Sequence, residues 1–148
     1  MTAAAYDKIF EWAQRSAFWP VQLGFGGCAA QTLAVLDPRH EMARFGPEVF
    51  RTGPRQGDFL IVSGPVPRKM APLLRRFWEQ MPEPRWVLSL GDGEDGGPFR
   101  TYAATEKVGR IIPVDVHVPG NPPGPDALLQ GLIELKEKID RATPGARP

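Results

Sequence analysis

Short apolar runs bounded by turn residues recur along the chain and predict buried strands. The run at 58–64 reads DFLIVSG, with apolar side chains at consecutive positions, which is typical of a strand covered on both faces. We predict further strands at 21–25, 85–90 and 110–118. Pro113 falls inside the last of these, so that strand should lie at an edge or carry a bulge.

Apolar residues at three- and four-residue intervals predict helices between these runs, over 6–17, 28–36, 70–81 and 125–140. The pattern is clearest at 70–81, where the expected core stripe consists of Met70, Leu73, Leu74, Phe77, Trp78 and Met81. The opposite side of this helix carries Arg75, Arg76, Glu79 and Gln80. In the first helix Trp12 falls outside the apolar stripe, which suggests that it docks on a partner.

Strands and helices that alternate with short connections predict an α/β fold, with a parallel sheet and helices on both faces. We expect an amphipathic helix at 1–17, a single α/β domain at 18–140 and a flexible tail at 141–148. Ligands of such sheets lie beyond the carboxyl ends of the strands. The loops that leave those ends are rich in Gly and Pro, and they should converge on one rim: 24–28, 64–68, 91–98 and 119–124.

Composition narrows the class of protein. The chain has 148 residues and a net charge of +1, from 18 Lys and Arg against 17 Asp and Glu, so it lacks the basic excess of a nucleic-acid-binding protein. No apolar run approaches the roughly 20 residues that cross a bilayer. The single cysteine, Cys28, cannot form an internal disulfide, which fits a reducing, cytoplasmic compartment.

Several long strings carry a resemblance to a known family. They read FWPVQLGFGGCAAQ, FRTGPRQGDFLIVSGPV, KMAPLLRRFWEQMPEPRWVLSLG and RIIPVDVHVPGNPPGPDALLQGLIELKEKI. In this order and over 18–139, the chain resembles the B-type subunit of NADH-quinone oxidoreductase (respiratory complex I) and the related small subunits of membrane-bound hydrogenases.

The resemblance implies a flavodoxin-like, doubly wound sheet within a membrane assembly. The expected partners are a hydrogenase-large-like subunit, a ferredoxin-like subunit and a membrane subunit. The expected place is peripheral, on the cytoplasmic side of the inner or plasma membrane. In the family this subunit holds the last [4Fe–4S] cluster, which passes electrons to quinone.

The family holds that cluster through a Cys-Cys pair after the first strand, a Cys in a Gly-Ser-Cys loop and a Cys in Pro-Gly-Cys-Pro-Pro. The matching positions here are Gly27, Cys28, Gly93 and Asn121, so one thiol remains, and Gln31 stands where the family usually has Glu. A [4Fe–4S] cluster normally needs four thiolates, and glycine offers no ligand while a neutral amide is a poor one. We therefore predict no cofactor and no catalytic residue, and expect a structural, non-redox subunit.

Two other functions stay open. The chain could be a true electron-transfer subunit whose cluster is completed by unconventional ligands or by a neighbouring chain. Alternatively, the emptied crevice could bind a small molecule, or a cation at Asp92, Glu94 and Asp95, although a solvated loop is the ordinary explanation for such a cluster. Cys28 at a strand-to-helix turn could be a reactive thiol, but a small buried residue is the simpler interpretation.

Possible contacts with neighbouring subunits are predicted from the resemblance. Arg51 and Arg55 belong to a basic stretch that continues through Arg68, Lys69, Arg75 and Arg76. His40 falls where the family often has Tyr. Trp12 and Trp19, together with Phe18, would form an exposed apolar patch on an isolated domain.

Overall fold

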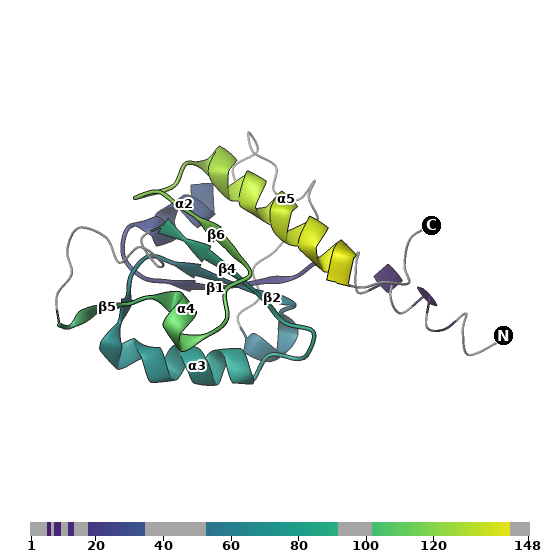
Figure 1. The fold of residues 1–148 in the computed structure, drawn as a ribbon, viewed down its shortest axis with the longest axis horizontal. Coiled ribbons are helices and arrows are strands. Elements are labelled where there is room, and N and C mark those ends of the chain that lie inside the picture. The colour runs from purple at the N-terminus through teal and green to yellow at the C-terminus, as the bar shows by residue number, and fades with distance from the viewer. Residues whose placement is uncertain are drawn as a thin grey trace.

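The structure is a computed structural model, and it describes residues 6, 8–9, 12–13, 18–34, 53–91 and 102–142, apart from the side chains at 31, 33 and 104–106. Its main sheet has four parallel strands in the order β1-β2-β4-β6 (Figure 1). These strands are β1 (Pro20–Gly24), β2 (Phe59–Ser63), β4 (Trp86–Leu90) and β6 (Val116–Val118). The predicted parallel α/β sheet is confirmed.

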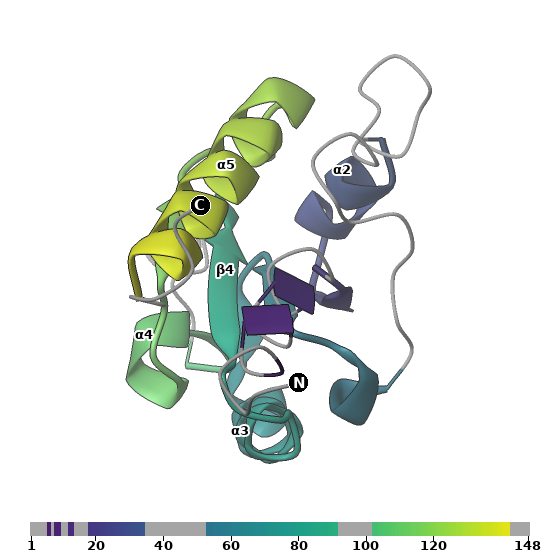
Figure 2. The same ribbon diagram turned by 90° about the vertical axis from the view of Figure 1, so that its right-hand side faces the viewer.

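Helices cover both faces of this sheet, as the turned view in Figure 2 shows. On one side lie α2 (Cys28–Ala34) and the long C-terminal α5 (Pro125–Ala142), and on the other lie α3 (Ala71–Glu79) and α4 (Val108–Ile111). Two 3₁₀ turns, η2 (Pro54–Gln56) and η3 (Arg68–Met70), precede β2 and α3. A small antiparallel sheet pairs β3 (Val66–Pro67) with β5 (Ala104–Glu106).

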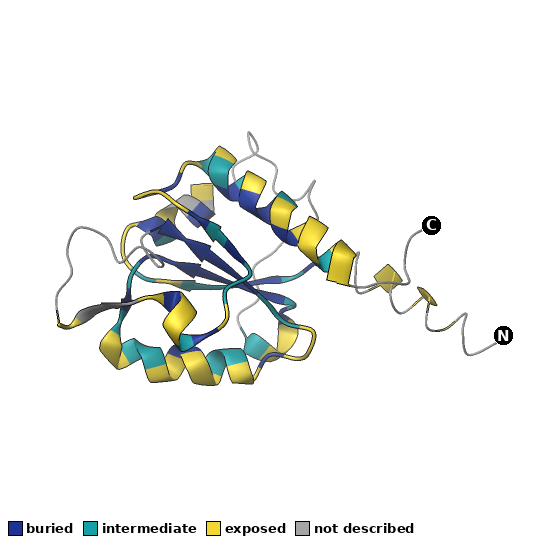
Figure 3. Ribbon diagram, viewed as in Figure 1, coloured by how far each residue is buried: buried dark blue, intermediate teal, exposed yellow. Residues whose placement is uncertain are grey.

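Strand β2 shows why an unbroken apolar run marks a central strand. All five of its residues are buried, because side chains alternate between two covered faces. Phe59 and Ile61 belong to a core shared with Leu128, Leu132 and Leu135 of α5. Leu60 and Val62 belong to the opposite core, which includes Leu74 of α3 and Val108 of α4. Figure 3 shows the resulting buried sheet between helices that are exposed on their outer sides.

The predicted helix at 70–81 is confirmed as α3, with Pro72 in the first turn, where proline is tolerated. Its expected core stripe is wrong at one position. Leu74 is 1% exposed and Met81 3%, whereas Leu73 is 50% exposed. A helix turns 100° per residue, so the face that packs on the sheet centres on Leu74 and leaves Leu73 at the rim.

The strand predicted at 110–118 is wrong in its first half. Residues 108–111 form α4, and the strand begins only at Val116. Pro113 therefore precedes β6 and creates neither an edge position nor a bulge within it. The apolar composition of RIIPV resembles a strand, but here Val108 and Ile112 pack against α3 from a helical turn. The helix predicted at 125–140 is confirmed as α5, which continues to Ala142.

The expected apolar patch near the N-terminus is wrong for Phe18. Its ring is 5% exposed and stacks on Phe59, with centroids 4.0 Å apart. Trp19 is half-buried, and its backbone N–H donates to a carboxylate oxygen of Asp58 at 3.0 Å. By contrast, Trp12 is 67% exposed, together with Tyr6 and Ile9. This end of the chain thus divides into a part packed on the domain and an aromatic part exposed to solvent.

Candidate functional site

The loops that leave the carboxyl ends of the strands converge, as expected. The backbone N–H of Phe25, just after β1, donates to the carbonyl of Ser63 at 2.7 Å. The N–H of Gly64, just after β2, donates to the carbonyl of Leu90 at 2.9 Å. These bonds continue the parallel ladder past the ends of the strands, so the first residues after β1 and β2 are held against the end of β4 at one rim. Of the expected loop at 91–98, the structure describes Gly91.

Cys28 lies at the centre of this rim, at the first residue of α2, and is 2% exposed. Gly91, the first residue after β4, has φ +76°, and a Cβ built on it would lie 2.7 Å from the Cys28 sulfur. That separation is far below van der Waals contact, so the thiol occupies the space that a side chain at 91 would need. Gly64 has φ +83°, and a Cβ built on it would collide with the carbonyl oxygen of Phe25 and lie 3.8 Å from the Cys28 Cβ.

Asn121 brings the fourth loop to the same place. It follows β6 and precedes a cis peptide bond to Pro122. Its side-chain oxygen lies 3.9 Å from the Cys28 sulfur, within the range of a weak S–H to oxygen hydrogen bond. Two of the four sequence-predicted positions, Cys28 and Asn121, are thus in contact although they are 93 residues apart in the chain.

Gly27 precedes Cys28 at this rim and is exposed. A Cβ built on it would meet no atom within 4 Å, so the backbone leaves room for a side chain there. Gly93, Gln31 and the acidic residues Asp92, Glu94 and Asp95 lie outside the residues or side chains that the structure describes.

Buried polar contacts fix α2, and thus Cys28, against the sheet. The Thr32 hydroxyl lies 3.4 Å from that of Ser63 at the end of β2, and both residues are fully buried. The Gln22 side chain donates to the carbonyl of Ala29 at 3.3 Å. Sequence analysis did not single out these residues, although a Thr four positions after Cys28 on a helix is expected to share its face.

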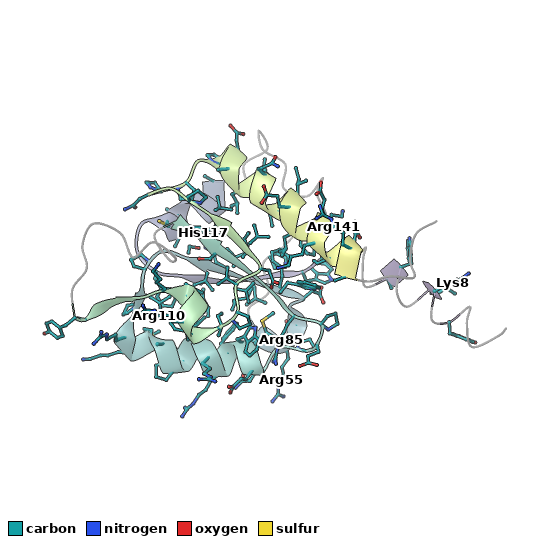
Figure 4. All side chains as sticks on the ribbon, viewed as in Figure 1. Lys8, Arg55, Arg85, Arg110, His117 and Arg141 are labelled. Carbon is teal, nitrogen blue, oxygen red and sulfur yellow. The ribbon has the colours of Figure 1, made fainter. Side chains whose placement is uncertain are left out.

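Ser89 and His117 form a second polar pair that sequence analysis missed. They are register neighbours on β4 and β6, and Ser89 is fully buried. Both ring nitrogens of His117 are shielded from solvent as well. Figure 4 shows His117 on the sheet. Among the described residues, no group of three or more His, Cys, Asp or Glu side chains is arranged to hold a metal ion.

The structure describes three of the five predicted interface residues. Trp12 is exposed at the N-terminal end, and Trp19 is half-buried at the start of β1. Arg55 is exposed on η2 (Figure 4). Arg51 and His40 lie outside the described residues, so an interface through these five positions remains a prediction. Within the described ranges, no helix is long and apolar enough to cross a membrane.

Comparison with known proteins supports the resemblance. Residues 26–135 match the family described as NADH ubiquinone oxidoreductase, 20 Kd subunit. The B-type subunit 1 of NADH-quinone oxidoreductase from Solibacter usitatus is 49% identical over 138 residues, which cover 93% of this chain and 73% of that protein. NADH-quinone oxidoreductase subunit 6 of Thermus thermophilus is 46% identical over 134 residues, covering 90% of this chain and 74% of the relative.

A solved structure agrees with these relatives. A chain of the membrane-bound sulfane sulfur reductase, an archaeal respiratory membrane complex, superimposes with a TM-score of 0.81 at 28% identity. The match covers 93% of the present chain and 78% of the other. Sequence and fold lead to one conclusion: this chain belongs to the NADH ubiquinone oxidoreductase 20 Kd subunit family, as a B-type subunit of an NADH-quinone oxidoreductase-type complex.

Proposed function

We propose that this chain is a structural, non-redox B-type subunit, which fills the position of the electron-transfer subunit in a complex I-like membrane assembly. The observation that carries the proposal is the donor set around Cys28. One thiol is present in the whole chain, and it faces a glycine at 91 and an amide at 121.

This donor set does not fit the family's [4Fe–4S] cluster. Each iron of such a cluster needs its own ligand, normally a thiolate. Gly27 and Gly93 have no side chain, and the Asn121 amide is neutral and hard where the iron–sulfide core favours a soft anion. With one thiolate in place of four, the chain lacks the cluster through which the family passes electrons to quinone. The chain alone therefore catalyses no reaction.

A scaffold role accounts for what is retained. The rim keeps its close approaches at Gly64 and Gly91, and the sheet keeps cores on both faces. A subunit of this kind would hold neighbouring subunits together and would not transfer electrons. Its proposed neighbours are a hydrogenase-large-like subunit, a ferredoxin-like subunit and a membrane subunit. Its proposed place is peripheral, on the cytoplasmic side of the membrane.

The test is to purify the chain anaerobically with its native partners and to measure iron and acid-labile sulfide, against the same assembly carrying Cys28→Ala. We expect co-purification with a hydrogenase-large-like subunit and the same iron content in both preparations. About four iron atoms per chain that disappear with Cys28→Ala would establish a cluster on unconventional ligands, and so an electron-transfer subunit. A wild-type chain that joins no assembly in its own cells would refute the scaffold role.

A further inference from the structure

One side of the molecule concentrates positive charge. Six exposed basic residues project from η3, α3 and the turn of α4: Arg68, Lys69, Arg75, Arg76, Lys107 and Arg110. We call this surface the basic face. Figure 4 shows Arg110 beside α4, with Arg141 on α5 across the sheet. The whole chain has a net charge of only +1, so this concentration is local.

Counter-charges on the same helices are few. On α3 and α4 together the one acidic residue is Glu79, which lies 3.4 Å from Arg75 one turn away. Both side chains of this pair are more than half exposed, so it adds little stability and opens readily for another partner. By comparison, α5 alternates acidic and basic side chains and holds its Arg141 against Glu137 at 3.0 Å.

Apolar and aromatic residues are exposed within the basic face. Leu73 is 50% exposed, and along α3 it lies between Lys69, four residues before it, and Arg76, three residues after it. Tyr102 is 88% exposed. It adjoins the face because the carbonyl of the next residue, Ala103, accepts the backbone N–H of Arg68 at 3.2 Å. The basic face thus contains an exposed leucine and is adjoined by an exposed tyrosine.

The composition of the face favours a protein over a lipid bilayer. Four of its six cations are arginines, whose planar guanidinium forms two parallel bonds to one carboxylate. Arginine and tyrosine are enriched at the centres of protein interfaces. A helix that lies in a membrane surface buries a broad apolar face, whereas α3 has buried Leu74 in the core and has Leu73 as its one exposed large hydrophobic side chain.

We infer that the basic face docks onto an acidic protein surface, with carboxylates around an apolar socket for Leu73. This inference rests on the proposed function, since that surface would belong to another subunit of the same assembly. The arginines would set orientation and the rate of encounter, and Leu73 would supply the buried contact.

The test compares two double charge reversals in the intact assembly. Arg76→Glu with Arg110→Glu alters the basic face, and Lys136→Glu with Arg141→Glu makes the same change of charge on α5. Retention of the chain is measured by native gel electrophoresis at rising NaCl. We expect at least about a tenfold loss of affinity for the basic-face variant, with release at lower salt, and wild-type retention for the α5 variant. Equal retention of both variants would refute the inference while leaving the proposed function intact.

Cross-linking identifies the occupant. A carbodiimide joins an amine directly to a carboxylate. Cross-links from Lys69 and Lys107 therefore identify the Asp or Glu side chains that contact them. We expect both to link to Asp or Glu of another polypeptide in the wild-type assembly, and Leu73→Ala to weaken retention without changing net charge. Links found only within this chain would refute the inference. So would face-dependent flotation with vesicles of equal parts phosphatidylcholine and phosphatidylglycerol, because the surface would then be lipid-binding.

Discussion

The Cys28 sulfur lies 3.9 Å from the side-chain oxygen of Asn121. Two loops that follow the first and last strands of the sheet thereby meet at a thiol and an amide. By the resemblance, the family would carry a thiolate at both positions, and we propose that the rim still converges but carries different chemistry. The backbone at Gly91 also lies close to the thiol.

Gly91→Ala should lower the free energy of unfolding by about 2 kcal/mol or more. The residue has φ +76°, and a Cβ there would lie 2.7 Å from the Cys28 sulfur and 3.1 Å from the carbonyl oxygen of Gly120. Chemical denaturation measures the effect. Combining Gly91→Ala with Cys28→Ala should recover part of the loss, because neighbouring changes are not additive when one relieves the other's clash.

The matched control is Gly124→Ala, since a Cβ at that position meets no atom within 4 Å. Its effect should stay within about 0.5 kcal/mol. Equal losses for the two alanine variants would mean that the crowding at Cys28 has no energetic consequence.

Asp58 gives a prediction about pH. Burial raises the pKa of its carboxyl above the ordinary value, although the hydrogen bond from the Trp19 backbone acts in the opposite direction. A carboxyl with a raised pKa in the folded state binds its proton more tightly there than in the unfolded chain. Its contribution to stability is therefore present below the unfolded pKa and is lost as pH rises through the folded pKa.

Asp58→Asn should remove this contribution, because the amide keeps an oxygen that accepts the Trp19 N–H but no longer titrates. The free energy of unfolding is measured for both proteins between about pH 3 and 7. Relative to wild type, the variant should gain stability as pH rises. The control is Asp126→Asn at the exposed start of α5. A difference between wild type and Asp58→Asn that does not change with pH would contradict the argument.

Much of this fold was predictable from the sequence, for a physical reason. The run FLIVS is buried on both sides of a sheet, and the helices after it show a three- to four-residue apolar period, so burial left its pattern in the residue types. The convergence of the loops followed from parallel strands alone. Loops that follow parallel strands lie at the same edge of the sheet, so a shared rim that includes Cys28 could be inferred from the topology.

Other features depended on tertiary packing that local pattern does not encode. RIIPV has the composition of a strand, and only its contacts with α3 make its first residues a helical turn. Leu73 and Leu74 both fit the helical period, so the sequence could not determine which of them the sheet covers. Phe18 was expected to be exposed because its partner Phe59 lies 41 residues away.

Asp115 should prove a larger structural contributor than its salt bridge suggests. One carboxylate oxygen lies 2.7 Å from the Lys138 amine of α5, and the other accepts the backbone N–H of the fully buried Val87 at 2.9 Å. Asp115→Ala leaves that N–H without this acceptor, which should cost about 1–3 kcal/mol of unfolding free energy. Lys138→Ala removes a partly exposed ion pair and the exposed hydrogen bond that the same amine donates to the Asp115 backbone carbonyl at 3.1 Å, together about 0–1 kcal/mol. Comparable losses measured by denaturation would assign the effect to the ion pair instead.

Restoring the family's ligands should restore iron binding. In Gly27→Cys with Gly93→Cys and Asn121→Cys, the side chain at 27 enters open space and the one at 121 stands beside Cys28. After anaerobic reconstitution with iron and sulfide, we expect about four iron atoms per chain and brown absorbance. The same triple variant with Cys28→Ala should bind less, because one iron then lacks its thiolate. If the triple variant takes up no more iron than wild type, the loops have lost the cluster's geometry as well as its ligands.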